Sequence, residues 1–262
     1  MSIHDIPAID VHAHYGTVNW GNHDLYNRFV TADAPTVLQR SLDSNIQYTI
    51  VSPLLGLRIG YDVIAANIEA AKIMAATEGL LQWVIIDPRI QQTYEQAEEM
   101  LKLPKCMGIK VHPEAHGYYM VDHARAIFEF AARHQAIVLT HSGCLHSLPE
   151  AMIPFANDFP QITLILAHIG NGYDGDPTHQ ARAIQAAKHR NVYADSSSSQ
   201  NIVPGLLEWT VNEVGAERIL FGTDTPVYSV PMQRARVDYA ELSDQQKQLI
   251  LRDNSRKLFD LE

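Results

Sequence analysis

The sequence predicts an α/β fold, a single-domain (β/α)8 TIM barrel that spans residues 1–262. The chain has 262 residues, close to the roughly 250 that eight βα units require. Short apolar, β-branched runs alternate with longer segments of helical periodicity, which is typical of βαβ units around a parallel sheet. Polar side chains recur where these runs end, and parallel barrels carry their functional groups at that end of the strands.

Eight runs have the composition of buried strands. They are Ala8–His14, Gln47–Pro53, Leu81–Asp87, Gly108–Pro113, Ile137–Gly143, Ile162–Gly170, Val192–Ser198 and Arg218–Pro226. The segment Ile162–Ala167 is apolar on both faces, as expected of a strand between the barrel core and a layer of helices. Eight such runs are the number that one closed barrel needs.

The segments between the runs show helical periodicity. Helices are expected over Asp62–Glu78, Asp122–His134, Ser147–Asp158, Pro177–Arg190, Ile202–Val214 and Ser243–Phe259. Pro177 suits the first turn of its helix, where a backbone N–H is not needed. The connection from Tyr15 to Ala34 is long for a barrel, and long loops of this kind are often functional lids.

Composition and charge narrow the class of protein. Apolar residues make up 46% of the chain, as in globular proteins, and no run is long enough to cross a bilayer. No secretory signal pattern is present, and two cysteines, Cys106 and Cys144, do not make a disulfide framework, so a cytoplasmic location is expected. The formal charge of -10, without a Lys/Arg cluster, disfavours nucleic acid or an anionic membrane and leaves a small-molecule substrate as partner.

Histidines and one aspartate stand at the ends of five of the eight runs. These ends read Asp10-Val-His12-Ala-His14, Lys110-Val-His112, Thr140-His141, Ala167-His168 and Thr223-Asp224. Polar groups that point into a barrel mouth carry a desolvation cost unless something satisfies them. A divalent cation satisfies imidazoles and a carboxylate together, and histidine with aspartate is a normal set of zinc ligands.

A single histidine at a strand end is more often a hydrogen-bonded structural residue than a ligand. His12 and His14 share one face of their strand, because residues two apart on a strand point the same way. A pair of this kind is a weak signal when it stands alone. The joint occurrence at one end of five strands favours a metal site over an accident of composition.

These segments together resemble the amidohydrolase superfamily. The resemblance is carried by Asp10–His14, Thr140–Gly143, His168, Phe221–Pro226 and the closing Ile250–Phe259. It covers nearly the whole chain and is strongest to the amidohydrolase 2 branch, which includes the aminocarboxymuconate semialdehyde decarboxylase-like enzymes. It implies one divalent metal ion, usually zinc, bound by His12, His14, His141 and Asp224, with His168 as a nearby acid/base. Barrels of this branch are often dimers, so a homodimer is one expectation.

Lys110 leaves the number of metal ions open. It occupies the strand position at which binuclear members of the wider superfamily carry a carboxylated lysine that bridges two ions, and His141 and His168 would then bind the second ion. The branch that the sequence resembles is usually mononuclear. Lys110 would in that case bind substrate or pair with a neighbouring carboxylate, and a divalent metal other than zinc remains an alternative.

The expected chemistry uses a metal-activated water. A bound zinc ion lowers the pKa of its water from about 15.7 toward 7. His168 is the expected general acid/base, because the unperturbed pKa of histidine is about 6.5. Asp224 is expected to act in catalysis as well as in metal binding, since the carboxylate at this position in the family can share the proton of the water.

Four side chains are candidates for substrate binding. Arg58 follows the second strand at the same rim, where its guanidinium could bind a substrate carboxylate through two hydrogen bonds. Lys110 and His112 belong to the fourth strand, and Trp20 lies in the long first loop. A surface arginine and a tryptophan that only packs the loop are the competing interpretations of Arg58 and Trp20.

Three functions remain, of which two share nearly every residue named above. The first is a metal-dependent hydrolase of a small, carboxylated ester, lactone or amide, favoured because the modest length leaves few insertions to shape an aromatic-acid pocket. The alternative is a nonoxidative, metal-dependent decarboxylase of an unsaturated or aromatic acid, favoured by the branch resemblance. The third, a metal-free binding barrel, requires the histidine cluster to be accidental.

Overall fold

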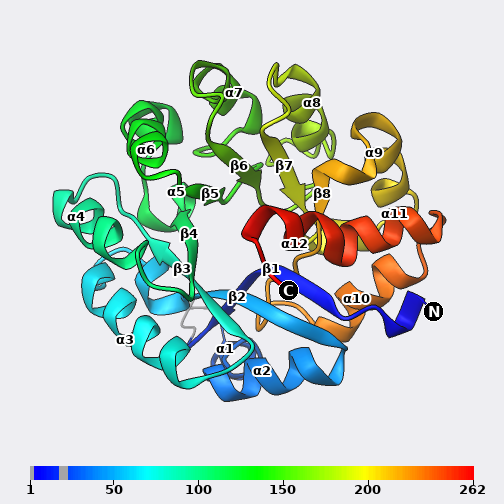
Figure 1. Ribbon diagram of the computed structural model, residues 1–262, viewed down its shortest axis with the longest axis horizontal. Helices are drawn as coiled ribbons and strands as arrows, with labels where there is room; N and C mark the ends of the chain where they lie inside the picture. Colours follow the sequence, from blue (N-terminus) through cyan, green and yellow to red (C-terminus); the bar gives the residue numbers. More distant parts are fainter. Residues whose placement is uncertain (1–2, 18–22) are drawn as a thin grey trace.

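A sheet of eight parallel strands forms the centre of the protein (Figure 1), as seen in a computed structural model that describes residues 3–17 and 23–262. The strands are β1 (Ala8–Tyr15), β2 (Ile46–Pro53), β3 (Leu80–Ile85), β4 (Cys106–Val111), β5 (Ile137–Thr140), β6 (Thr163–Leu166), β7 (Val192–Asp195) and β8 (Ile219–Leu220). Each pairs in parallel with the next along the chain. All eight predicted strands are confirmed, and with them the TIM barrel.

Backbone hydrogen bonds between β1 and the segment that follows β8 close the sheet into a nearly complete barrel. The amide of Val11 donates to the carbonyl of Phe221 at 2.9 Å, and that of His14 donates to Thr225 at 2.7 Å. The predicted eighth strand, Arg218–Pro226, is much shorter than expected as a regular strand. The residues after β8 form these closing hydrogen bonds instead. They place the first and the last predicted strand side by side.

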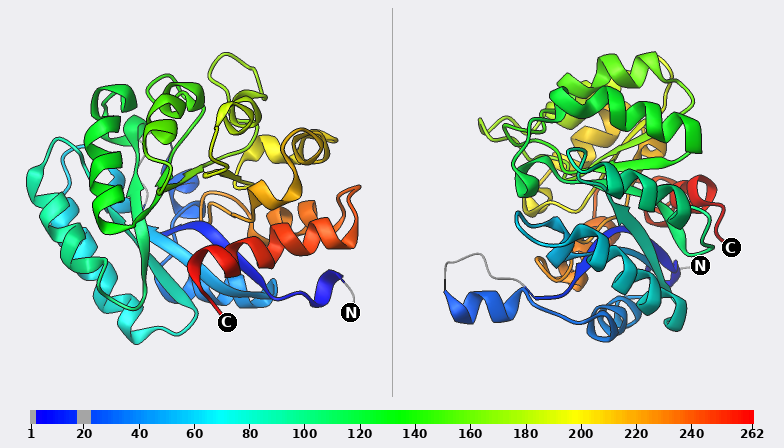
Figure 2. Two further views of the ribbon diagram at one scale, coloured as in Figure 1. Left: turned by 45° about the horizontal axis from the view of Figure 1, so that its top comes forward. Right: turned by 90° about the vertical axis from the view of Figure 1, so that its left-hand side faces the viewer.

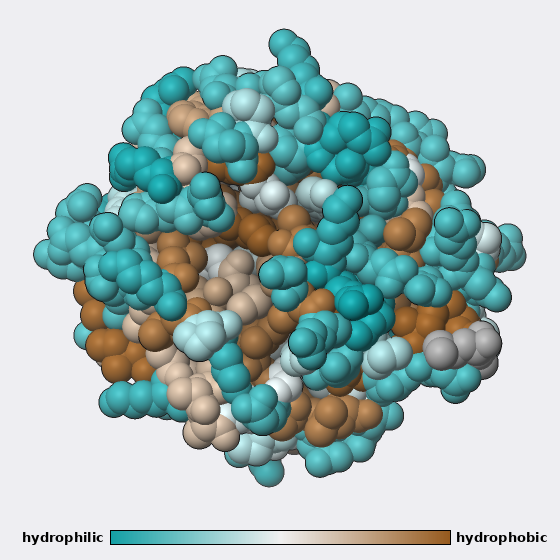
Figure 3. All heavy atoms as spheres, in the orientation of Figure 1, coloured by the Kyte–Doolittle hydropathy of each residue, from teal (hydrophilic) through white to brown (hydrophobic). Residues whose placement is uncertain are grey.

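Helices surround the barrel on the outside (Figures 1 and 2). They are α1 (Asp24–Phe29), α2 (Ala34–Asp43), α3 (Val63–Ala76), α4 (Gln91–Met100), α5 (Pro113–His116), α6 (Met120–His134), α7 (Pro149–Asp158), α8 (His179–Ala186), α9 (Leu206–Val214), α10 (Val230–Asp238), α11 (Asp244–Gln248) and α12 (Asn254–Phe259). Hydrophilic residues cover most of the face shown in Figure 3, with hydrophobic ones visible between them. None of the helices in the described ranges combines the length and hydropathy that crossing a membrane would require.

Several helix boundaries differ from the expected ones. The helix after β6 begins at His179, so Pro177 lies in the preceding turn rather than in its first turn. The expected helix Ser243–Phe259 is divided by a π-helical turn over Leu249–Asp253. The long first connection contains α1, and α2, α4, α5 and α10 also lie in segments where the sequence analysis names no helix. Helix α4 is almost entirely polar along its exposed side, so its apolar periodicity is weak.

Side chains from β3 and α12 fill the barrel interior at the end where the strands begin. Trp83 lies fully buried inside it, and its indole N–H donates to the carbonyl of Val11 at 2.8 Å. Phe259 of α12 packs edge-on against Trp83, with 5.6 Å between ring centroids. Helix α12 therefore covers the end where the strands begin, and the opposite end, from which α1 projects in Figure 2, is left for a pocket.

Gly143 allows the loops after β5 and β6 to approach each other. Its φ is +90°, and a Cβ atom at this position would overlap the backbone carbonyl of Asn171. The overlap is far inside van der Waals contact, so only glycine fits without moving the backbone. Gly175 has a similar φ of +83°, but a Cβ atom there would meet no other atom within 4 Å.

The two glycines make a matched pair for a stability test. Gly175→Ala should lower the free energy of unfolding by about 1–2 kcal/mol, the usual penalty of a left-handed residue with a Cβ. Gly143→Ala should cost about 1–3 kcal/mol more, because it adds overpacking to the same backbone strain. Chemical denaturation measures both, and equal losses would show that the carbonyl of Asn171 moves aside freely.

Candidate active site

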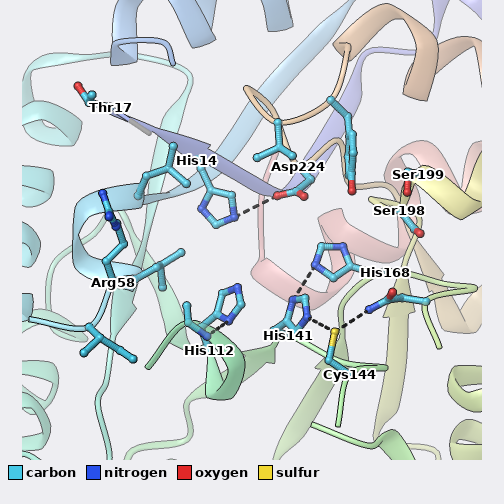
Figure 4. Close-up of a pocket in the computed structure, with 17 residues that line it drawn as sticks. His14, Thr17, Arg58, His112, His141, Cys144, His168, Ser198, Ser199 and Asp224 are labelled. Carbon is cyan, nitrogen blue, oxygen red and sulfur yellow. Dashed lines mark hydrogen bonds and ion pairs between the residues drawn. The ribbon is translucent and has the colours of Figure 1, made fainter. Parts of the chain in front are cut away.

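A pocket of ≈ 520 Å³ opens at the C-terminal ends of the strands (Figure 4). Its wall includes residues that the sequence analysis placed in the site, together with a cysteine that it treated only as a free thiol. These are His14, Arg58, His112, His141, His168 and Asp224, with Cys144 as the cysteine. The volume is within the range of small-molecule sites, and the strand ends bring these side chains together as expected for a barrel.

His12 and His14 of β1 are buried, with their Nδ1 atoms turned away from the pocket. Nδ1 of His12 lies 2.9 Å from Oδ2 of Asp195, and Nδ1 of His14 lies 3.2 Å from the carbonyl oxygen of Ser52. The carboxylate of Asp195 is an acceptor, so Nδ1 of His12 carries its proton and the neutral ring has its lone pair on Nε2, the tautomer that a metal ligand needs. Nδ1 of His14 also lies 2.9 Å from the hydroxyl of Ser52, which can donate or accept, so His14 can adopt the same tautomer when its Nε2 binds a metal ion.

The Nε2 atoms of the two histidines face Asp224. Oδ1 of Asp224 lies 3.1 Å from Nε2 of His14 and 3.9 Å from Nε2 of His12. Burial first, and then the charge of Lys110, lower the pKa of His12 to about 3, which keeps this imidazole neutral. Each of the three residues offers a ligand atom within 4.8 Å of the other two. This donor set, with its outer hydrogen bonds, fits a divalent metal ion.

Asp195 is a buried carboxylate of the candidate site that the sequence did not indicate. It is fully buried at the end of β7, and its carboxylate also accepts the backbone N–H of His168 at 3.1 Å and that of Ser197 at 3.0 Å. Burial would raise its pKa, but the hydrogen bonds from His12 and Ser197 hold the pKa below the usual range. The carboxylate is therefore ionised and orients His12. The only feature of the sequence that indicates a site residue here is the position of Asp195 at the end of a strand. The serines that follow it, Ser196–Ser199, suggest a polar loop instead.

Asp10 positions the turn that carries Asp224. Its carboxyl accepts hydrogen bonds from the hydroxyl of Thr223 at 2.6 Å and from the amide of Thr223 at 3.0 Å. Burial raises the pKa of Asp10 to about 8, against the lowering effect of these bonds.

Asp224 and His168 both have positive φ, +54° and +69°. Such backbone strain in residues other than glycine is characteristic of functional sites.

His141 and His168 form a pair beside this group. Nδ1 of His141 lies 3.1 Å from Nε2 of His168, and Nε2 of His141 lies 3.2 Å from Sγ of Cys144 (Figure 4). His168 belongs to a second group of possible ligand atoms with His12 and Asp195, whereas His141 belongs to neither group found among residues 3–17 and 23–262. The role of His141 as a ligand stays a prediction.

Lys110 is fully buried beneath the pocket and is not part of its wall. Its Nζ lies 2.9 Å from Nε2 of His12. Since that Nε2 carries a lone pair, the lysine donates to it. Burial lowers the pKa of Lys110 to about 8. A metal ion bound to the same lone pair would displace this hydrogen bond. In this position Lys110 contacts a candidate metal ligand rather than the substrate, which the sequence suggested as its partner.

The other expected substrate residues have different positions. Arg58 lines the pocket, and its guanidinium lies over the ring of Tyr61, 5.1 Å from the centroid. His112 caps α5, where its Nδ1 accepts the amide of Ala115 at 3.2 Å, and it also lines the pocket. Trp20 lies outside the described residues. Arg58 and His112 are thus at the pocket, and their contacts with substrate stay predictions.

The sequence matches the amidohydrolase family over residues 9–261. The chain therefore belongs to the amidohydrolase family, as the resemblance indicated. No curated protein sequence matches the chain.

Solved structures of decarboxylases share the fold of this protein. One is 2,6-dihydroxybenzoate decarboxylase from Rhizobium, with 14% identity, a TM-score of 0.74 and 99% of each chain covered. A second is 5-carboxyvanillate decarboxylase from Sphingomonas paucimobilis, with 14% identity, a TM-score of 0.72 and coverage of 98% of this chain and 100% of the other. A third is dihydroxybenzoic acid decarboxylase from Polaromonas sp. JS666 with bound manganese and the inhibitor 2-nitroresorcinol, with 14% identity, a TM-score of 0.73 and coverage of 99% and 97%.

Asp195→Asn should weaken metal binding by about 10- to 100-fold, the usual effect of losing the hydrogen-bond partner of a ligating histidine. The amide can still contact Nδ1 of His12, but it no longer enforces the Nδ1–H tautomer with a full charge. Competition between the protein and a chelator for zinc measures the affinity. Asp158→Asn, on the surface of α7, is the control, and equal affinities in both variants would contradict the role of Asp195.

The protein should bind close to one equivalent of zinc, and Lys110→Ala should retain it. The alanine removes a hydrogen bond that competes for Nε2 of His12 but removes no ligand of the first ion. Titration of the metal-free protein measures the stoichiometry. Two equivalents in the native protein, with the second lost in Lys110→Ala and restored by added short carboxylic acids, would show a binuclear centre with a carboxylated lysine.

Proposed function

We propose that this protein is a metal-dependent, nonoxidative decarboxylase of a small aromatic or unsaturated acid. The observation that carries the proposal is that His14, His141 and Asp224 line one pocket together with His168 and Arg58. His12 groups with His14 and Asp224. The sequence alone favours a hydrolase slightly, with the decarboxylase as the alternative. The decarboxylases among the structural neighbours support that alternative better.

His12, His14 and Asp224 would hold the metal ion, with His141 as the expected fourth ligand. Zinc is the ion that the histidine-rich donor set favours, and manganese, bound in one neighbour, is the alternative. When bound, the ion supplies positive charge that stabilises negative charge on the substrate. The substrate would occupy the same pocket, whose wall includes Arg58 and His168.

Arg58 is proposed to bind an anionic oxygen of the substrate through its planar guanidinium, which suits a carboxylate or phenolate. Its contact with Tyr61 restrains the side chain. An acid bound by Arg58 would lie in the pocket that His168 also lines. His112 completes the same wall beside His141.

His168 is proposed to carry the proton that the reaction consumes. As the bond to the carboxylate breaks, its electron pair stays on the substrate carbon, that carbon receives a proton, and carbon dioxide leaves. Ser197 contacts Nδ1 of His168 through its hydroxyl at 2.9 Å and its carbonyl at 3.3 Å. These contacts occupy Nδ1, and Nε2, which faces Nδ1 of His141 at 3.1 Å, would become available for proton transfer when His141 binds the metal ion. The carboxylate of Asp224, beside it, is the second group that could share a proton.

Product analysis tests the reaction. The zinc- or manganese-loaded protein, given dihydroxybenzoates in D2O, should release carbon dioxide and place one deuterium on the ring carbon that lost the carboxyl group. Methyl esters of the same acids and simple aliphatic lactones serve as hydrolase substrates. Release of methanol or ring opening, without carbon dioxide from any acid, would support the hydrolase and contradict the decarboxylase.

His168→Asn should retain the metal while kcat for the accepted acid falls by about 10²- to 10⁴-fold, the usual contribution of a general acid/base. His189→Asn, at an exposed position, should leave both unchanged. If the metal is lost together with activity in His168→Asn, His168 is a ligand and another group carries the proton.

A further inference from the structure

We infer that Cys144 is a positioning residue for His141, and that its thiol supports both tautomers of this imidazole, one without and one with a bound metal ion. The inference rests on the metal-dependent function proposed above. It concerns a contact on the pocket wall rather than a ligand. The chain of contacts that supports it runs from Ser197 through His168 and His141 to the sulfur of Cys144.

Hydrogen bonds fix the proton of His168 on Nδ1. The hydroxyl of Ser197 donates to the ionised carboxylate of Asp195, so its oxygen is left to accept. The carbonyl oxygen of Ser197, 3.3 Å from Nδ1 of His168, can only accept as well. Nδ1 of His168 is therefore the donor, and in the neutral ring Nε2 carries the lone pair.

The lone pair of His168 fixes the position of the proton on His141. Nδ1 of His141 lies 3.1 Å from the Nε2 lone pair of His168, so it donates. Nε2 of His141 is then an acceptor, and the group that faces it at 3.2 Å is Sγ of Cys144. Without a metal ion, the thiol S–H donates to His141.

Metal binding through Nδ1 of His141 requires the other tautomer. Nδ1 has to offer its lone pair, so the ring proton moves to Nε2 and points at Cys144. A thiol is both a weak donor and a weak acceptor, and the sulfur can accept this N–H once its own hydrogen has turned away. Asn171 anchors the sulfur, because its Nδ2 lies 3.5 Å from Sγ and also donates to the carbonyl of Ser142 at 2.8 Å.

Stacking leaves the ring little freedom to find another partner. The rings of His112 and His141 are stacked, with 4.3 Å between centroids and an interplanar angle of 10°. His112 is in turn held by the backbone of α5 through Ala115. His141 can thus change its tautomer in place, while a rotation that tilts the ring out of its plane would break the stack.

Nitrogen NMR of 15N-histidine protein tests the tautomers directly, with zinc as a diamagnetic probe. His141→Gln identifies the resonances of His141 by their loss. We expect the Nδ1–H form in the metal-free protein and the Nε2–H form after zinc is added. A single tautomer in both states would overturn the inference while leaving zinc binding, and hence the proposed function, intact. Failure of the protein to bind zinc or manganese would overturn both.

Cys144 variants give the second readout. Cys144→Ala should weaken zinc binding by about 10-fold, at the lower end of the effect of losing the outer partner of a ligating histidine, because Nε2–H of His141 loses its acceptor. Cys144→Ser retains a donor and an acceptor and should recover part of that loss. Cys106→Ala is the control, since Cys106 lies at the start of β4. Zinc affinity of Cys144→Ala equal to that of Cys106→Ala would show that the thiol does not support the ligand.

Discussion

Closure of the barrel between β1 and the segment after β8 is the constraint on which the candidate site depends. The amides of Val11 and His14 donate to carbonyls that flank Asp224, so the closing hydrogen bonds also set the distance between the two imidazoles and the carboxylate. Asp10 strengthens the same junction through Thr223. The ligand atoms are therefore positioned by strand pairing, which is more rigid than a loop.

The polar groups under the pocket form one connected network in an otherwise apolar barrel. Burying them costs free energy unless each is paired. The carboxylate of Asp195 accepts hydrogen bonds from Nδ1 of His12, from the backbone N–H of His168 and from the hydroxyl of Ser197. Burial lowers the pKa of His168 and of His141 below that of free histidine. The network thus holds neutral imidazoles around a small number of carboxylates, which suits a site that takes its positive charge from a metal ion.

The sequence predicted the strands well because barrel strands are buried on both faces and stand out as apolar runs. It also predicted that His14, His141, His168 and Asp224 lie in one pocket, because the strand ends meet at one end of a barrel. It could not predict that Asp195 pairs with His12, since that contact depends on the register between distant strands. Polar helices such as α4 were missed for a simpler reason: their buried side is too narrow to show a clear period.

The cover that α12 provides has a consequence for how the protein is made. Trp83 and the aliphatic side chains around it are enclosed only when Phe259 packs against them, and α12 is synthesised after all eight strands. During translation the strands emerge with their apolar inner faces exposed to water, as a sheet that cannot yet bury its core. Partly folded chains with exposed apolar surface are prone to aggregation, so the packing of α12 over Trp83 removes a surface of this kind.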